Sequence, residues 1–159
     1  MRVCLGIDPG LARVGYGAVA QSDAGLLPVC YGCIETSPSM SFSERIMKIY
    51  SDVNGKIEVI RPDFVSIERL FFGKNVKTAE YVYQARGVIM LLIAQNNLPV
   101  TELTPTVIKR AVCGNTKADK HEVQTRIRDI LALDEIPRPD DTADALAAAV
   151  AGLSHFEGG

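Results

Sequence analysis

Three apolar, strand-like runs occupy the first 35 residues, and an alternation of helical and strand-like segments follows them. The early runs cover residues 3–8, 14–20 and 28–35 and are joined by short turns, a pattern that predicts an antiparallel meander. Two later strand-like runs cover residues 64–68 and 99–103 and alternate with helical patterns. This order of elements predicts an α/β sandwich in which helices flank a mixed five-stranded sheet.

Five helices are expected around this sheet. The first has apolar residues at spacings of three and four, and Ser41 with Glu44 forms the pattern of a capping box at its start. Pro105 stands at the first position of the third helix, where proline is tolerated. The fourth is basic on one side and the fifth is rich in alanine. The predicted helices cover residues 41–60, 78–95, 104–112, 117–133 and 140–153.

Length and composition predict a single domain. The chain has 159 residues, of which 47% are hydrophobic and 23% charged, and it shows neither an internal repeat nor a linker-like stretch. We therefore expect one domain over residues 1–159, with the last few residues as a flexible tail. The longest apolar run, residues 87–94, is shorter than the roughly 18 residues that a membrane span needs, so no membrane partner is expected.

The N-terminus and the cysteines predict a cytoplasmic protein with reduced thiols. A turn at residues 8–10 interrupts the N-terminal apolar stretch before it reaches the length of a signal peptide, and a chain of this size in that compartment does not need a disulfide framework. Cys30 and Cys33 have the spacing of a metal or redox motif. An offset of three along a strand places them on opposite faces, which argues against both roles.

Acidic residues stand at two strand ends and at the start of the last helix. Asp8 and Glu68 end predicted strands, while Asp141 and Asp144 share one helix face. Because sites in open α/β sheets form at the carboxyl ends of strands, these four carboxylates could converge. Such a cluster needs divalent cations to stay ionised, and oxygen ligands favour Mg²⁺ or Mn²⁺. Two such ions can hydrolyse a phosphodiester bond.

A simpler interpretation of the acids stays open. Asp140 and Asp141 could cap the last helix and complement its dipole, and Glu68 could be a solvated strand end. Asp140 follows Pro139 directly, and this place suits an N-cap better than a metal ligand.

Five segments of the sequence form a recognisable set of motifs: residues 5–10, 15–17, 67–75, 84–87 and 141–147. Together they resemble the RuvC family of Holliday-junction resolvases, nearly from end to end. The resemblance implies a ribonuclease H-like three-layer sandwich that acts as a homodimer with two Mg²⁺ ions in each site, or Mn²⁺ as a substitute. It also implies paired nicks in a four-way DNA junction that leave 5'-phosphates and 3'-hydroxyls. It further implies a bacterial, nucleoid-associated protein that works with a branch-migration complex of the RuvA and RuvB type.

The resemblance assigns roles to single residues. It makes Asp8, Glu68, Asp141 and Asp144 the catalytic, metal-binding acids. Phe71 would stack on an unpaired base at the junction centre, which an aromatic ring can do for any sequence, and Lys109 and Lys120 would contact DNA near the scissile phosphate. The chain departs from the family pattern at Tyr83 and Thr116. Weaker candidates for backbone contacts, all in the basic segment of residues 69–130, are Lys74, Lys77, Arg86, Lys117, Arg126 and Arg128.

Other functions compete with this one. A ribonuclease H-like nuclease of the YqgF type shares the opening motif, but the Phe71 region and the two lysines argue against it. An actin-like or sugar-kinase ATPase needs two domains around its nucleotide, which this length does not supply. A non-catalytic junction-binding protein is expected to have lost at least one acid. Dinucleotide binding is disfavoured because Gly15-Tyr16-Gly17 falls inside a strand.

Overall fold

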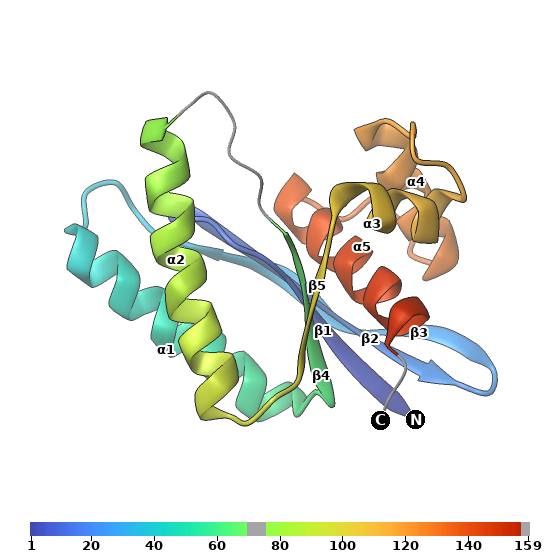
Figure 1. Ribbon diagram of the computed structural model, residues 1–159, viewed down its shortest axis with the longest axis horizontal. Coiled ribbons are helices and arrows are strands. Elements are labelled where there is room, and N and C mark those ends of the chain that lie inside the picture. Colours follow the sequence, from blue (N-terminus) through green and yellow to red (C-terminus); the bar gives the residue numbers. More distant parts are fainter. Residues whose placement is uncertain (70–75, 157–159) are drawn as a thin grey trace.

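The computed structural model describes residues 1–69 and 76–156, and a five-stranded sheet with strand order β3-β2-β1-β4-β5 lies at its centre (Figure 1). The meander is confirmed, because β1 pairs with β2 and β2 pairs with β3 in antiparallel fashion. Parallel pairing of β1 with β4 and of β4 with β5 makes the sheet mixed, as predicted. The strands are β1 (Arg2–Asp8), β2 (Arg13–Ser22), β3 (Gly25–Glu35), β4 (Phe64–Glu68) and β5 (Val100–Leu103).

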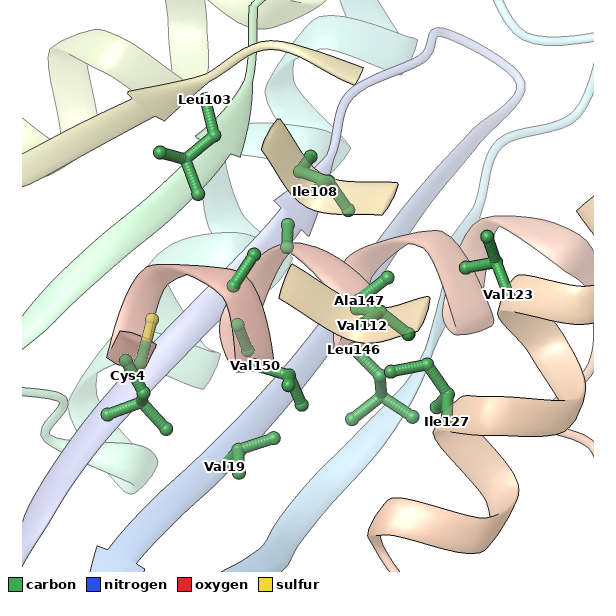
Figure 2. Close-up of a cluster of buried hydrophobic side chains, with 14 of the residues drawn as sticks. Cys4, Val19, Leu103, Ile108, Val112, Val123, Ile127, Leu146, Ala147 and Val150 are labelled. Atoms are coloured by element: carbon green, nitrogen blue, oxygen red, sulfur yellow. The ribbon is translucent and has the colours of Figure 1, made fainter. Parts of the chain in front are cut away.

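Helices cover both faces of the sheet and form three layers with it. In Figure 1, α1 and α2 lie on one face, whereas α3, α4 and α5 lie on the other. Each face has its own hydrophobic core, and Figure 2 shows the core around α5, where Leu146 and Val150 lie near Val19 of the sheet. The helices are α1 (Phe42–Ile60), α2 (Val76–Gln95), α3 (Pro105–Cys113), α4 (Lys120–Ile130) and α5 (Asp140–His155).

The helix starts follow local capping chemistry. At α1 the predicted capping box is confirmed: the Glu44 backbone N–H donates to Ser41 Oγ at 3.2 Å, and the Ser41 N–H donates to Glu44 Oε2 at 2.6 Å. The prediction of a helix over residues 117–133 was too long. The Asp119 carboxylate accepts from the Glu122 N–H at 2.8 Å and fixes the start of α4 at Lys120, because an N-cap residue is itself outside the helix.

Helix α5 lies directly on the sheet at two glycines. A Cβ atom on Gly6 would be 1.9 Å from the carbonyl oxygen of Ala145, and one on Gly15 would be 2.0 Å from the carbonyl oxygen of Asp141. Only residues without a side chain allow backbone to approach backbone so closely. Gly6 of β1 and Gly15 of β2 therefore fix the position of α5, and with it the position of the first turn of that helix.

The cysteines agree with the sequence prediction. Cys30 lies opposite Ala18, a residue of the core on the α1 side, and Cys33 lies opposite Gly15, which contacts α5. The two thiols therefore point to opposite faces, and all four cysteines are free. None of the described helices is long and apolar enough to cross a membrane. The tail expected at the end of the chain, residues 157–159, lies outside the described residues.

Candidate active site

The four predicted acids lie at one end of the sheet. Asp8 is the last residue of β1 and Glu68 the last residue of β4. These strands are parallel neighbours with Ile7 opposite Ile67, so their final carboxylates stand side by side. Asp141 and Asp144 belong to the first turns of α5. They reach the same end because α5 rests on Gly15, the residue that pairs with Asp8 across β1 and β2.

Burial and neighbouring negative charge both act on Asp8. The pKa of Asp8 is raised to about 8, mainly because its carboxyl group is buried. The negative charges of Asp144, Asp141 and Glu68 raise this pKa further, as does a hydrogen bond with the Asp141 carboxyl. Burial and like charge both favour the protonated acid. Without a cation, Asp8 therefore holds its proton at neutral pH.

Two more acids are perturbed in the same direction. Burial raises the pKa of Glu68, and the charge of Asp144 adds to this effect, while Lys109 and Lys120 oppose it. Burial also raises the pKa of Asp144 against the opposing charge of Lys120. The two lysines therefore neutralise only part of the negative charge in the site.

The acids fit a divalent cation in ligand type and in charge. All four offer carboxylate oxygens, the ligands that Mg²⁺, Mn²⁺ and Ca²⁺ prefer. Burial, together with neighbouring carboxylates, raises the pKa values of Asp8, Glu68 and Asp144, and a nearby cation would favour their ionised forms. In residues 1–69 and 76–156, no three Asp, Glu, His or Cys side chains are gathered as closely as a metal site requires. The four carboxylates are thus neighbours, but their oxygens do not converge on a single position.

Two of the predicted DNA-contacting residues face these acids. Lys109 projects from α3 and Lys120 is the first residue of α4, and both line a pocket of about 280 Å³ together with Glu68 and Asp144. A phosphate group in this pocket would lie between lysine ammonium groups and carboxylates. The remaining lining residues are Pro105, Ile108, Val123 and Ala147.

Asp140 holds Lys120 instead of capping its own helix. The N-cap of α5 is Pro139, which makes no side-chain hydrogen bond, so the N-cap interpretation of Asp140 was wrong. The Lys120 Nζ lies 3.2 Å from Asp140 Oδ2 and 3.6 Å from Asp144 Oδ2, and Gln124 Nε2 donates to Asp140 Oδ1 at 3.1 Å. The hydrogen bond from Lys120 lowers the pKa of Asp140. Asp140 therefore links the start of α5 to α4.

The other predicted DNA contacts are spread around the molecule. The Arg86 guanidinium forms an ion pair with Glu102 at 2.7 Å between α2 and β5, which indicates a structural role. Arg128 pairs with its neighbour Asp129 at 2.9 Å, and the side chains of Lys117 and Arg126 are exposed. Three candidates, Phe71, Lys74 and the Lys77 side chain, lie outside the described residues, as does the interpretation of Phe72 as a core residue.

A second hollow borders the acids, and sequence reasoning missed it. It measures about 710 Å³ and includes Asp141 at its edge. Its two arginines lie outside the basic segment of residues 69–130, so the charge distribution gave no signal for them. We name this hollow the aromatic groove. It is lined by residues 9–12 and by Arg13, Met40, Phe42, Arg45, Tyr81, Val82 and Asp141.

Comparison with known proteins gives one consistent result. The family model described as crossover junction endodeoxyribonuclease RuvC matches residues 4–152. The protein of that name from Desulfitobacterium hafniense is 47% identical over 146 residues, which are 92% of this chain and 88% of that protein. The one from Caldicellulosiruptor saccharolyticus is 47% identical over 151 residues, 94% of this chain and 90% of that protein.

A solved structure agrees with the sequence comparison. The structure described as T. thermophilus RuvC in complex with Holliday junction substrate superposes with a TM-score of 0.90 at 33% identity, covering 96% of this chain and 93% of that chain. This likeness confirms the ribonuclease H-like three-layer arrangement. The family model and the relatives each cover most of the chain, and the acids occupy the sheet end where the motifs predicted them. This protein belongs to the RuvC family of crossover junction endodeoxyribonucleases.

Proposed function

We propose that this protein resolves four-way DNA junctions by paired, metal-dependent hydrolysis of phosphodiester bonds during homologous recombination and DNA repair, leaving 5'-phosphates and 3'-hydroxyls. The observation that carries the proposal is the meeting of four carboxylates from β1, β4 and α5 beside Lys109 and Lys120 in a chain of the RuvC family. Residues 1–159 would act as one domain.

The four acids would hold the cations. Asp8, Glu68, Asp141 and Asp144 supply the oxygen ligands, and we propose two Mg²⁺ ions in each site, with Mn²⁺ as a substitute. When bound, such ions activate a water molecule and stabilise the leaving oxygen of the phosphodiester. The raised pKa of Asp8 supports this assignment, because a group that ionises reluctantly by itself gains most from a nearby cation.

The lysines would hold the DNA backbone next to the acids. Lys109 and Lys120 line the same pocket as Glu68 and Asp144, and their ammonium groups can contact phosphate whatever the base sequence. The Lys120 ammonium, shared between Asp140 and Asp144 in the free protein, can turn to a phosphate oxygen that enters the pocket. Phe71 would stack on a base at the junction centre.

The outer face of α2 would form a homodimer contact. Leu91 is 52% exposed on this helix, and a Cβ atom on Gly87 would meet no atom within 4 Å. Leu91 lies one helical turn from Gly87. An exposed apolar side chain beside a glycine allows the helix of a second subunit to pack closely against α2. A dimer also supplies the two sites that paired nicks need.

The dimer contact can be tested by introducing a charge. Leu91→Glu should shift the protein toward the monomer in sedimentation velocity runs and reduce paired nicking. Val59→Glu, on the outside of α1 where Val59 is 83% exposed, is the matched control and should leave the dimer intact. If Leu91→Glu sediments like the unsubstituted protein, the contact lies elsewhere.

Family membership also supports a cellular setting. We propose that the protein acts at the bacterial nucleoid, in the cytoplasm, with a branch-migration complex of the RuvA and RuvB type. Co-purification of those two proteins with this one on an immobilised junction would test this partnership.

The function is tested by junction cleavage. A labelled four-way junction, a linear duplex and a single strand of the same sequence are incubated with Mg²⁺ and with EDTA. We expect paired nicks in the junction only, and only with Mg²⁺. Asp8→Asn should abolish cleavage but retain junction binding, whereas Asp23→Asn, in the turn between β2 and β3, should change neither. Cleavage of single strands or RNA instead would favour a nuclease of the YqgF type, and cleavage by Asp8→Asn would refute the assignment of the acids.

A further inference from the structure

The aromatic groove has the surface of a nucleotide-binding site. Phe42, the first residue of α1, is 42% exposed, and Tyr81 of α2 is 48% exposed. Their ring centroids lie 6.0 Å apart with the planes at 38°, so the two rings touch while part of each stays open to solvent. Exposed ring faces are the surfaces on which unpaired bases stack, whatever the base.

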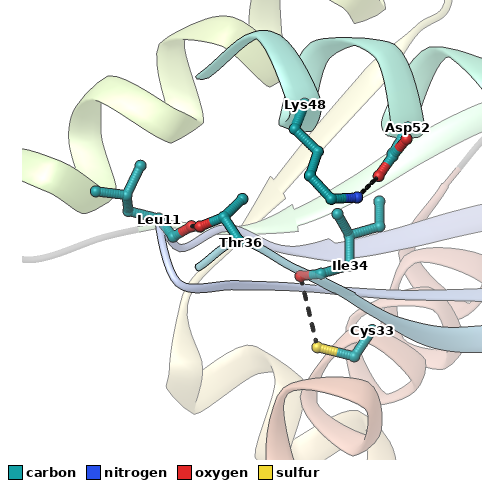
Figure 3. A network of polar contacts seen from close by, with 6 residues as sticks. All are labelled: Leu11, Cys33, Ile34, Thr36, Lys48 and Asp52. Carbon is teal, nitrogen blue, oxygen red and sulfur yellow. Dashed lines mark hydrogen bonds and ion pairs between the residues drawn. The ribbon is translucent and has the colours of Figure 1, made fainter. Parts of the chain in front are cut away.

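Two guanidinium groups lie in the same groove. Arg45 Nε donates to Thr36 Oγ1 at 2.8 Å, and the Thr36 hydroxyl donates to the Leu11 carbonyl oxygen at 2.6 Å; Figure 3 shows the second of these bonds. The Arg45 Nη atoms have no partner among the described residues. Arg13 Nε lies 3.7 Å from Glu35 in an exposed pair, which is a weak contact. Both guanidinium groups can therefore donate to a phosphate.

The groove is continuous with the acids. Asp141 lies at its edge, and the loop of residues 9–12 that follows Asp8 forms one wall. A DNA strand whose scissile phosphate lies at the acids is therefore next to the groove. Duplex DNA cannot use the aromatic faces, because its bases are stacked inside the helix. An unpaired nucleotide can use both the rings and the arginines, and about 710 Å³ lies within the range of small-ligand pockets.

We propose that the aromatic groove binds an unpaired nucleotide of the cleaved strand, adjacent to the scissile phosphate, with its base on Phe42 and Tyr81 and its phosphate on Arg13 and Arg45. This inference rests on the proposed junction-resolving function and adds a subsite to it. The groove would favour a strand whose pairing is already disrupted at the branch point. It would thus contribute to the preference for junctions over linear duplex.

The test removes the ring faces and leaves the apolar character. Tyr81→Leu should weaken junction binding about tenfold, and the double variant with Phe42→Leu should weaken it more, since base stacking on an aromatic side chain is worth about that factor or more. Binding of linear duplex should stay within twofold. Arg13→Gln should reduce the slope of binding against salt by about one phosphate contact. Tyr31→Leu, at an exposed tyrosine of β3 outside the groove, is the control and should bind as the unsubstituted protein does.

Cross-linking locates the nucleotide directly. Junctions that carry 5-iodouracil on either side of the scissile phosphate are irradiated with the protein, and a cross-link to Tyr81 or Phe42 is expected from one position. Unchanged junction affinity of the double variant, or cross-links at neither residue, would overturn the proposal. So would a shift of the double variant to the monomer, since the groove would then be a subunit contact. Failure of the unsubstituted protein to cut any junction would instead refute the proposed function.

Discussion

Replacing Gly15 by alanine should displace an active-site helix without changing any acid. The new Cβ atom would lie 2.0 Å from the Asp141 carbonyl oxygen and 2.4 Å from its carbonyl carbon, whereas ordinary contact begins at 3.4 Å. Both contacting atoms belong to the backbone, so no side-chain rotation can relieve the overlap. Either α5 moves away by about 1.4 Å, the difference between 3.4 and 2.0 Å, or β2 bends by the same amount.

The structure sets the size of the effect. Inserting a methyl group into a packed contact destabilises a protein by about 1–3 kcal/mol, and for a chain of this size each kcal/mol lowers Tm by about 2–4 °C. A 1 Å misplacement of catalytic groups can reduce the rate about a hundredfold, and here Asp141 is the residue that moves. We therefore expect a folded protein whose single-turnover cleavage rate is lowered about a hundredfold. Junction binding should change little, because Lys109 and Lys120 belong to α3 and α4.

The assay pairs single-turnover cleavage of a four-way junction with a thermal melt. Gly55→Ala is the matched control, because Gly55 lies within α1 and a Cβ atom there would meet nothing within 4 Å. It should leave cleavage unchanged and add about 0.5–1 kcal/mol of stability, as alanine does for glycine inside a helix. If Gly15→Ala cuts junctions at the unsubstituted rate and has the same Tm, the backbone contact does not position α5, and the reasoning fails.

Three further predictions follow from single contacts. In EDTA, the free energy of unfolding should fall as pH rises from about 4 to about 8, because folded Asp8 keeps a proton that the unfolded chain releases. The loss from Asp8 is at most about 1.4 kcal/mol per pH unit. Guanidinium melts of Asp8→Asn should show a shallower pH dependence, and an unchanged slope would contradict the assignment to Asp8. Ser41→Ala removes the side-chain cap of α1 and should lower stability by about 1 kcal/mol in the same melts with cleavage unchanged; an unchanged midpoint would contradict the capping role. Glu102→Gln leaves the Arg86 guanidinium without its carboxylate partner, and the Arg86 side chain is only 16% exposed. We expect the free energy of unfolding to fall by about 1–3 kcal/mol, and an unchanged value would show that Arg86 finds another acceptor.

Elements whose pattern is local were predictable from the sequence. The capping box at Ser41 and the isoleucine and valine spacing of α1 need only near neighbours, and the structure reproduces that helix from residue 42 to residue 60. The start of α4 was missed because two candidate starts lie close together. Asp119 supplies the cap, while Lys117 donates its N–H to Asn115 Oδ1 at 2.9 Å in a preceding turn, and apolar periodicity does not distinguish them.

Only those residues of the candidate site that lie at the ends of strands or helices could be predicted from the sequence. Asp8 and Glu68 follow apolar strands, and parallel pairing brings such ends together. The position of α5 on the sheet depends on the contact between Gly15 and Asp141. These two residues are distant in the sequence, and no local pattern links them. The aromatic groove was missed for the same reason. It combines side chains from β2, α1 and α2, and no local spacing links them.

The balance of charge around the acids connects cation binding with substrate binding. The N-terminus of α5 offers a partial positive charge to Asp141 and Asp144, and Lys109 and Lys120 stand opposite Glu68. These contributions oppose the repulsion among the four acids, yet burial and the neighbouring carboxylates still hold the pKa of Asp8 near 8. A DNA phosphate that approaches this end of the sheet meets repulsion from the same carboxylates that cations would occupy. Divalent cations bound by these acids would supply compensating positive charge. We therefore expect cation binding at the acids to favour the approach of a phosphate, because Lys109 and Lys120 oppose only part of the effect of the acids on Glu68.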